Sequence, residues 1–195
     1  MALIFPYNSL IRYRNILTKL HTLWISVEFK SIGENSSICY PIVLKGGKYI
    51  TIGNQTGLGK RGTLTAWDSY TCDSFIPEIS IGNNTSIGED YHITAINKIQ
   101  IGNNVLMGKK ITITDNAHGK ADLESISYPP AKRTLDTKGP VIIEDGVWIG
   151  DKVTILPNVT IGKNSIIGAN ALVTKDIPAN CVAGGVPALV IKRIV

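Results

Sequence analysis

An aliphatic residue recurs at nearly every sixth position between residues 32 and 173, and a small residue usually follows it. One stretch reads Ile81-Gly-Asn-Asn-Thr-Ser and continues as Ile87-Gly-Glu-Asp-Tyr-His. A period of six fits neither an amphipathic helix nor a long alternating strand. It fits a coil of short flat faces joined by tight corners. The chain is therefore predicted to form a parallel β-helix.

A longer spacing supports this prediction. Equivalent hexads, which begin with Ile-Gly or a similar pair, recur at Ile32, Ile52, Ile81, Ile101, Ile143 and Ile161. Three hexads make one triangular turn of eighteen residues, and a turn of twenty residues has two extra residues at one corner. The two intervals that are longer than this predict insertions near 66–78 and 114–140. One inward aliphatic residue per face is expected to stack on its equivalents in adjacent turns, with Gly and Asn at corners that need unusual backbone angles.

The length of 195 residues and the aromatic content of 7% favour a single repeat domain with short appendages. We divide the chain into a helical segment, 1–30, and a β-helix with a C-terminal tail, 31–195. The helix is expected over 8–27, where one apolar stripe combines Leu10, Tyr13, Leu17, Leu20 and Trp24. This helix is expected to cap the first turn of the coil. Docking on an anionic membrane surface is the alternative, because the same helix carries Arg12, Arg14 and Lys19.

Charge and cysteine usage exclude several classes of function. The net charge of +5 comes without a basic and aromatic run, so nucleic acid is not an expected partner, whereas a phosphorylated small ligand is. Cys39, Cys72 and Cys181 are odd in number and widely separated, which argues against a disulfide framework or a zinc site. No segment has the length and apolarity of a membrane span. We expect a cytoplasmic protein that binds no metal.

Three further segments point to a known family. They are Ile113-Thr-Asp-Asn-Ala-His-Gly119, Lys138-Gly-Pro-Val-Ile-Ile-Glu-Asp-Gly-Val-Trp-Ile-Gly150 and Val173-Thr-Lys-Asp-Ile-Pro178. With its hexads and the later Gly184-Gly-Val-Pro-Ala188, the chain resembles the hexapeptide-repeat acyltransferases over residues 30–195. The resemblance is greatest to sugar O-acetyltransferases of the galactoside, maltose and lipopolysaccharide-modifying type. It implies an all-β fold with a left-handed coil, a homotrimer, and acetyl-CoA bound between subunits, with 114–140 as a long loop that reaches across.

Acetyl transfer to a hydroxyl requires removal of the hydroxyl proton, and histidine suits this task near pH 7. The chain has His21, His92 and His118. We expect His118 to be the base, because it opens the long loop and matches the family's catalytic histidine. His92 could line the same cleft or occupy a corner of the coil. His21 is expected to pack or to lie at the surface.

Two neighbours of His118 are ambiguous. Asp115 and Asn116 could orient the imidazole or contact the acceptor, but a turn rich in Asp and Asn is expected here in any case. The resemblance also places Asp90 where galactoside-type members have an asparagine that touches the acceptor. This departure from Asn weakens the assignment of Asp90 to substrate binding.

The resemblance assigns acetyl-CoA contacts to Asp151, Ala169, Thr174, Lys175 and Lys192. Lys175, Lys192 and Arg193 also have a physical reason to contact CoA, since it carries several phosphate charges, although a solvated basic face would look the same. Trp148 could pack against the pantetheine arm or serve the structure of the coil.

The predicted activity is acetyl transfer from acetyl-CoA to a hydroxyl of a sugar or surface-polysaccharide precursor. The transfer would be direct within a ternary complex, with backbone amides at a corner stabilising the oxyanion. Three alternatives remain: N-acetylation of an amino sugar or antibiotic, a zinc-dependent carbonic anhydrase built on three histidines, and a non-catalytic scaffold. A nucleophilic Cys72 is disfavoured because no histidine neighbours it in the sequence.

Overall fold

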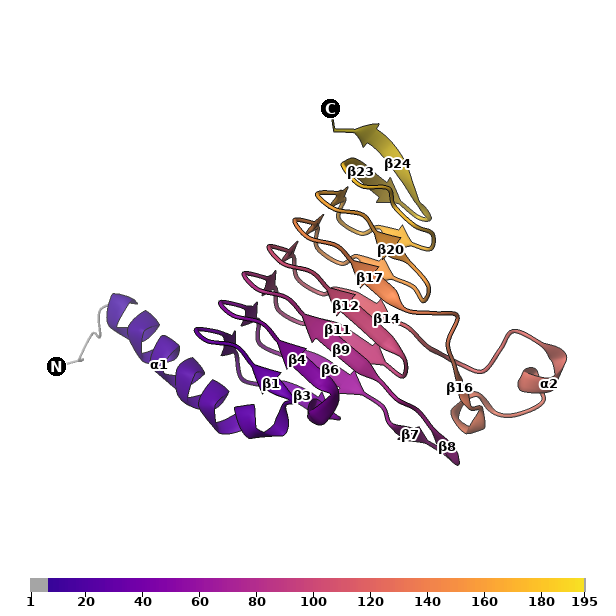
Figure 1. Ribbon diagram of the computed structural model, residues 1–195, viewed down its shortest axis with the longest axis horizontal. Helices are drawn as coiled ribbons and strands as arrows, with labels where there is room; N and C mark the ends of the chain where they lie inside the picture. The colour runs from indigo at the N-terminus through magenta and orange to yellow at the C-terminus, as the bar shows by residue number, and fades with distance from the viewer. Residues whose placement is uncertain (1–6, 195) are drawn as a thin grey trace.

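The computed structural model describes residues 7–194, and most of them form a coil with three flat faces (Figure 1). Each turn of the coil contributes one short strand to each of three sheets. Sheet 1 contains, in spatial order, β1 (Ser31–Ile32), β4 (Ile50–Ile52), β9 (Glu78–Ile81), β12 (Lys98–Ile101), β17 (Val141–Ile143) and β20 (Thr160–Ile161). All of its strand pairs are parallel.

The other two sheets follow the same principle. Sheet 2 contains β2 (Ser37–Ile38), β5 (Gly57–Leu58), β10 (Ser86–Ile87), β13 (Leu106–Met107), β18 (Trp148–Ile149), β21 (Ile166–Ile167), β23 (Cys181–Gly185) and β24 (Ala188–Arg193). Sheet 3 contains β3 (Ile42–Lys45), β6 (Gly62–Ala66), β11 (His92–Ala95), β14 (Thr112–Thr114), β19 (Thr154–Ile155) and β22 (Leu172–Val173). The fold is a left-handed parallel β-helix, so the predicted fold class is confirmed.

The core of the coil is built from stacked columns of aliphatic side chains. In sheet 1 the column is formed by the residues on which the sequence prediction rests, Ile32, Ile52, Ile81, Ile101, Ile143 and Ile161. Five of these six are at most 2% exposed, and Ile32, in the first turn, packs against the core from a half-buried position. Burial of one such side chain stabilises the fold by about 1.5–3 kcal/mol. The longer spacing therefore reflects the stacking of successive turns, and the period of six reflects the three faces of each turn.

The corners correct one detail of the sequence prediction. Left-handed backbone angles occur there mainly at asparagines and other non-glycine residues, such as Asn84 and Asn104. The glycines of the Ile-Gly pairs serve a different purpose. A Cβ added to Gly82 would lie 2.6 Å from the carbonyl carbon of Gly102 in the next turn. These glycines are needed because adjacent turns approach closely, and not because the backbone turns at them.

The helix α1 (Tyr7–Ile25) precedes the coil and contacts β2 in its first turn. Thr22, Ile25 and His21 contribute to this contact, while the predicted apolar stripe stays largely exposed. The Thr22 hydroxyl accepts a hydrogen bond from the Ile38 amide at 2.8 Å, and Ile25 is buried. The predicted stripe is 44–74% exposed; its members are Leu10, Tyr13, Leu17, Leu20 and Trp24. Within residues 7–194 no helix has both the length and the apolarity to cross a bilayer.

Two insertions leave the coil between sheet 3 and sheet 1. The first follows β6 and forms a hairpin of β7 (Ser69–Tyr70) and β8 (Asp73–Ser74). The second follows β14 and contains β15 (Ala117–His118), α2 (Leu123–Ile126), η3 (Pro130–Lys132) and β16 (Leu135–Asp136). Figure 1 shows both insertions on the same side of the coil. Short 3-10 turns also occur at η1 (Ser26–Glu28) and η2 (Gly47–Tyr49), and the antiparallel pair β23 and β24 ends the coil.

Gly62 lies against a buried aromatic ring and has no room for a side chain. A Cβ at Gly62 would overlap the ring of Tyr91, which is 1% exposed. Gly62→Ala is therefore expected to lower the free energy of unfolding by about 1–3 kcal/mol, as overpacking of a core usually does. Gly57→Ala is the matched control, because the nearest atom there is the Ser37 hydroxyl at 3.6 Å. Urea denaturation of both variants checks this, and equal losses of stability would contradict it.

Candidate active site

A cleft of about 520 Å³ lies on the outer face of sheet 3, beside the two insertions. Its floor is formed by side chains that point outward from the coil, and five of them are threonines. The cleft is lined by Val43, Thr63, Thr65, Trp67, Tyr70, His92, Thr94, Thr112, Thr114, Asn116, Ala117, His118 and Leu135. Threonine side chains thus form much of the floor, and aromatic and histidine side chains complete the lining.

His118 is placed at this cleft by the second insertion. It belongs to β15, which pairs antiparallel with β16 so that His118 lies opposite Leu135. The imidazole is exposed, and the ring of Tyr70 meets it edge to face, with 5.4 Å between the ring centroids. The Tyr70 hydroxyl donates a hydrogen bond to the Ala131 carbonyl at 3.0 Å. Both insertions therefore meet at His118.

His92 lies in the same cleft, at the start of β11. It is exposed and stacks between Thr63 and Thr112 on the outward face of sheet 3. Of the two placements open from the sequence, the structure thus shows the one in the cleft. His92 is the second imidazole available to a ligand bound there.

The third histidine lies elsewhere. His21 Nδ1 is 2.9 Å from the Ile38 carbonyl, and its side chain lines a separate groove beside α1. The described part of the chain, residues 7–194, contains no cluster of three or more His, Cys, Asp or Glu side chains that could hold a metal ion. The three histidines do not converge as a carbonic anhydrase site would require.

Asp115 is fully buried and turned away from the imidazole. Its two carboxylate oxygens accept hydrogen bonds from the Ile96 and Asn97 amides, both at 2.9 Å. Asn116 donates to Asp115 Oδ1 at 3.0 Å and to the Thr94 carbonyl at 3.3 Å, and it also lines the cleft. The contacts of Asp115 are those of a residue that holds a turn of the backbone, whereas Asn116 can still reach a ligand in the cleft.

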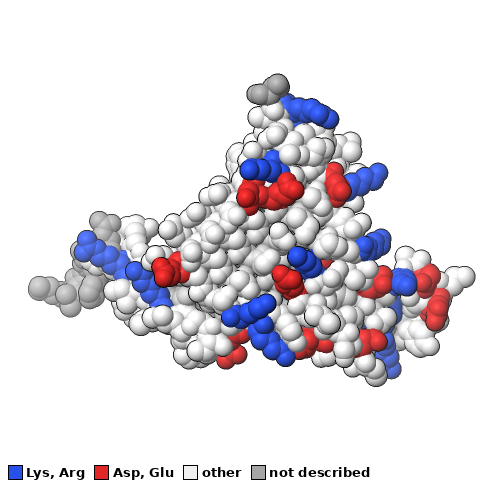
Figure 2. All heavy atoms as spheres, in the orientation of Figure 1, with Lys and Arg blue, Asp and Glu red and all other residues white. Residues whose placement is uncertain are grey.

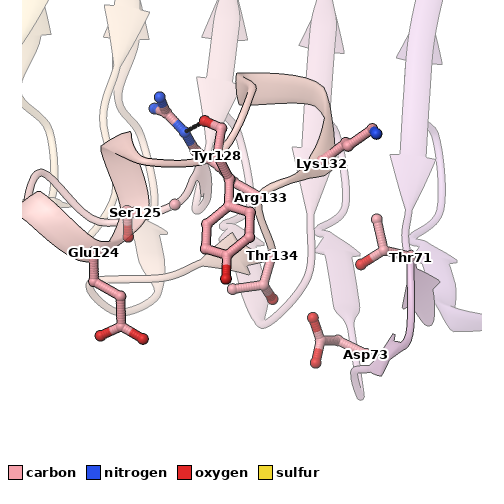
Figure 3. A pocket seen from close by; sticks show the side chains of 9 residues that line it. Thr71, Asp73, Glu124, Ser125, Tyr128, Lys132, Arg133 and Thr134 are labelled. Carbon is pink, nitrogen blue, oxygen red and sulfur yellow. Dashed lines mark hydrogen bonds between the residues drawn. The ribbon is translucent and has the colours of Figure 1, made fainter.

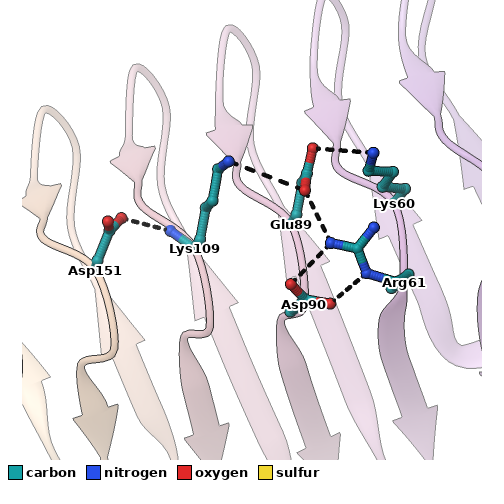
Figure 4. Close-up of polar contacts among 6 residues, drawn as sticks. All are labelled: Lys60, Arg61, Glu89, Asp90, Lys109 and Asp151. Carbon is teal, nitrogen blue, oxygen red and sulfur yellow. Dashed lines mark hydrogen bonds and ion pairs between the residues drawn. The ribbon is translucent and has the colours of Figure 1, made fainter.

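Asp90 does not line the cleft. It lies at the corner between sheet 2 and sheet 3, where Arg61 donates two hydrogen bonds to it, at 2.6 and 2.9 Å (Figure 4). The hydrogen-bonded guanidinium of Arg61 lowers the pKa of Asp90. Glu89 accepts a further bond from Arg61 at 2.9 Å. Because its carboxylate is committed to this pair, Asp90 is a poorer candidate for acceptor contact in this subunit than the family pattern suggested.

The residues expected to contact acetyl-CoA gather mainly on sheet 2. Trp148, Asp151 and Ala169 line one cavity of about 370 Å³ on its outer face. The ring of Trp148 is 51% exposed. Lys192 belongs to the same outward row, since Trp148 pairs with Ile166, Ile166 with Val182 and Val182 with Lys192.

The remaining predicted contacts lie outside this cavity. Thr174 and Lys175 are exposed just after β22 of sheet 3, and Arg193 is exposed at the end of β24. The Asp151 carboxylate accepts a hydrogen bond from the Lys109 amide at 2.7 Å, which ties it to the neighbouring turn (Figure 4). In one chain, the cavity on sheet 2 and the cleft with His118 therefore lie on different faces of the coil.

Trp67 and Tyr70 form a wall of the cleft, and neither was among the predicted site residues. Their ring centroids are 5.9 Å apart, and the Lys45 ammonium lies 3.2 Å from the centroid of the Trp67 ring. The aromatic composition of the first insertion was the available signal. It could not show that the hairpin folds back against His118.

A second, smaller cavity of about 270 Å³ lies behind this wall (Figure 3). Neighbouring residues face opposite sides: Tyr70 and His118 line the cleft, whereas Thr71 and Gly119 line the second cavity. Charged side chains also line it, namely Asp73, Glu124, Lys132 and Arg133. The two insertions thus touch along a thin partition.

Comparison with known proteins agrees with this architecture. The family model described as bacterial transferase hexapeptide (six repeats) matches residues 140–175. A protein of Escherichia coli K12 named for O-acetyl transfer in lipopolysaccharide biosynthesis is 38% identical over 119 residues, which are 59% of this chain and 60% of that protein. Galactoside O-acetyltransferase of the same strain is 34% identical over 171 residues, which are 85% of this chain and 64% of that enzyme. The chain thus spans about three fifths of the length of these relatives.

Among solved structures, a mutant of the N-acyltransferase AntD from Bacillus cereus superposes with a TM-score of 0.73. It contains coenzyme A and dTDP-4-amino-4,6-dideoxyglucose. The match covers 90% of this chain and 89% of AntD at 21% identity, and at that identity it shows a common fold alone. In its hexads, its three parallel sheets and its similarity to these relatives, the chain matches the hexapeptide-repeat acetyltransferases.

Proposed function

We propose that this chain transfers an acetyl group from acetyl-CoA to a hydroxyl of a sugar or surface-polysaccharide precursor, with His118 as the general base. The observation that carries the proposal is the exposed imidazole of His118 in a cleft lined by threonine and aromatic side chains, where both insertions meet. The names of the two Escherichia coli relatives support acetyl transfer to sugar hydroxyls. We choose acetyl-CoA as the donor because the chain is similar to this family of acetyltransferases.

The chemistry requires one base and one open path for the acceptor. Acetyl-CoA supplies the acetyl group as a thioester. His118 accepts the proton of the acceptor hydroxyl. At the same time the hydroxyl oxygen bonds to the acetyl carbon, and the bond between that carbon and the sulfur of CoA breaks. His118 then returns that proton to the departing thiolate. No side chain is acylated, so Cys72 has no role in this scheme.

The cleft suits a sugar better than an apolar acceptor. The outward threonines offer donors and acceptors for sugar hydroxyls. Trp67 and Tyr70 offer aromatic faces for the apolar C–H groups of a sugar ring. Asn116 has a side-chain amide at the same place, and we assign it to acceptor contact.

The donor site is proposed to form between subunits of a homotrimer. Three of the assigned CoA contacts share the cavity on sheet 2, whereas His118 lies over sheet 3 of the same chain. A neighbouring subunit that presents its sheet 2 to this sheet 3 would bring the two half-sites together. Lys175, Lys192 and Arg193 are exposed and free to pair with CoA phosphates, and Thr174 adjoins Lys175.

N-acetylation of an amino sugar is the second candidate. The same base and donor site would serve an amine, and the fold itself occurs in an N-acyltransferase. O-acetylation forms an ester and N-acetylation forms an amide, so the type of bond in the product distinguishes the two reactions. The purified protein is incubated with acetyl-CoA and glucosamine or glucose, and the product is treated with hydroxylamine, which cleaves acetyl esters and leaves amides intact. An ester supports the proposal, whereas a hydroxylamine-stable product from glucosamine alone would replace it.

Tyr70 is expected to hold His118 and the second insertion in place. Tyr70→Phe keeps the ring against His118 but loses the bond to the Ala131 carbonyl. We expect kcat to fall about threefold in this variant and about tenfold or more in Tyr70→Ala, because both contacts are then lost. Tyr128→Phe is the control, since Tyr128 belongs to the same insertion and is exposed. A kcat of Tyr70→Ala equal to that of the wild type would exclude the role.

A further inference from the structure

The apolar stripe of α1 has no partner in the described chain. Leu10, Tyr13, Leu17, Leu20 and Trp24 fall on one side of a helix with 3.6 residues per turn, and all are exposed. The helix contacts the coil at His21, Thr22 and Ile25, none of which belongs to the stripe. A continuous exposed apolar face of this kind marks an interaction surface.

The charges beside the stripe indicate what covers it. Arg14 falls on one edge, while Arg12 and Lys19 fall toward the other, and all three are exposed. The helix contains no Asp or Glu between residues 7 and 25. In Figure 2 Lys and Arg side chains lie along the region of α1. The covering surface must therefore accept an apolar face and supply negative charge at its edges.

An anionic bilayer surface meets both requirements. Basic residues at the edges of an apolar helical face pair with lipid headgroups while the apolar side chains enter the boundary with the acyl chains. Trp24 and Tyr13 are residue types that favour this boundary. Pairing of α1 with a second α1 is disfavoured, because it would bring the cations of two helices together with no carboxylate from either.

We propose that α1 binds in the plane of an anionic lipid bilayer and anchors the protein at its surface. Figure 1 shows α1 at one end of the coil, away from both insertions. The cleft with His118 thus stays open when α1 is bound. The proposal does not depend on the acetyl-transfer reaction and is tested without it.

The test is co-sedimentation of the full chain with vesicles. Vesicles of phosphatidylcholine with one third phosphatidylglycerol are compared with vesicles of pure phosphatidylcholine at low salt. We expect binding to the anionic vesicles that weakens at least tenfold in the neutral vesicles, in 0.5 M NaCl, or in the triple variant Arg12→Gln, Arg14→Gln, Lys19→Gln. The double variant Leu20→Gln, Trp24→Gln is expected to lose binding to a similar extent.

Leu189→Gln is the matched control, since Leu189 is 68% exposed on β24 at the other end of the coil. It is expected to bind anionic vesicles as the wild type does. Thermal unfolding of each variant shows that loss of binding is not loss of fold. Absence of binding to anionic vesicles, or equal binding by the Leu20 and Trp24 double variant, would overturn the proposal. Oligomers that dissociate in that double variant, with no vesicle binding, would assign the stripe to a second copy of the chain instead.

Discussion

His118→Ala is expected to lower kcat for sugar acetylation at least about a hundredfold, because general-base catalysis contributes on the order of 10²–10⁴. His118 is exposed at the cleft, and the backbone pairing of His118 with Leu135 does not involve the imidazole. The KM for acetyl-CoA is expected to change little, since the assigned donor contacts lie on another face. Initial rates of thiol release from acetyl-CoA measure both quantities.

His92→Ala is the matched control for this prediction. It removes an imidazole from the same cleft without touching the second insertion. A loss of less than about tenfold in kcat is expected, as for a group that contacts the acceptor but does not take its proton. A larger loss in His92→Ala than in His118→Ala would transfer the role of base to His92.

Asp115→Ala is expected to lower the free energy of unfolding by about 2–4 kcal/mol, because it leaves two amides without acceptors. The Ile96 amide is buried and the Asn97 amide partly so. Asp115→Asn keeps one acceptor oxygen and is expected to lose about half as much. Equilibrium denaturation in urea measures both changes. If the unfolding free energy falls with urea concentration as steeply as in the wild type, the denatured state is unchanged.

This prediction also separates the two roles considered for Asp115. If Asp115 holds the turn, stability falls, and activity measured well below the unfolding transition falls less than in His118→Ala. Wild-type stability combined with a loss of kcat as large as that of His118→Ala would instead make Asp115 part of the catalytic machinery.

The coil could be predicted from the sequence because its repeat is local. The same position of each hexad faces inward, so Ile81, Ile101 and Ile143 reveal the column before any pairing is known. The helix and its place beside the first turn were predicted as well, but the face that makes the contact was not. Periodicity shows that Leu17 and Trp24 share a face of α1, and it does not show what that face meets. The structure leaves this face exposed and attaches the helix through Thr22 and Ile25.

The site could be predicted only in part, because its contacts join distant residues. His118 was found from its place after a strand and from the family pattern. Asp115 looked like its partner, yet the amides that bind Asp115 lie 18 and 19 residues earlier, in the preceding turn. Tyr70 reaches His118 only because the first insertion folds back across the cleft. A sequence shows that an insertion exists, but the direction in which it folds depends on packing between turns.

Acetyl transfer to a sugar hydroxyl with His118 as the base is tested by measuring thiol release from acetyl-CoA. The purified full chain is assayed with and without hydroxyl-bearing sugars. We expect release that requires a sugar hydroxyl and is lost in His118→Ala. Equal release by wild type and His118→Ala, or release only with amine acceptors, would contradict it.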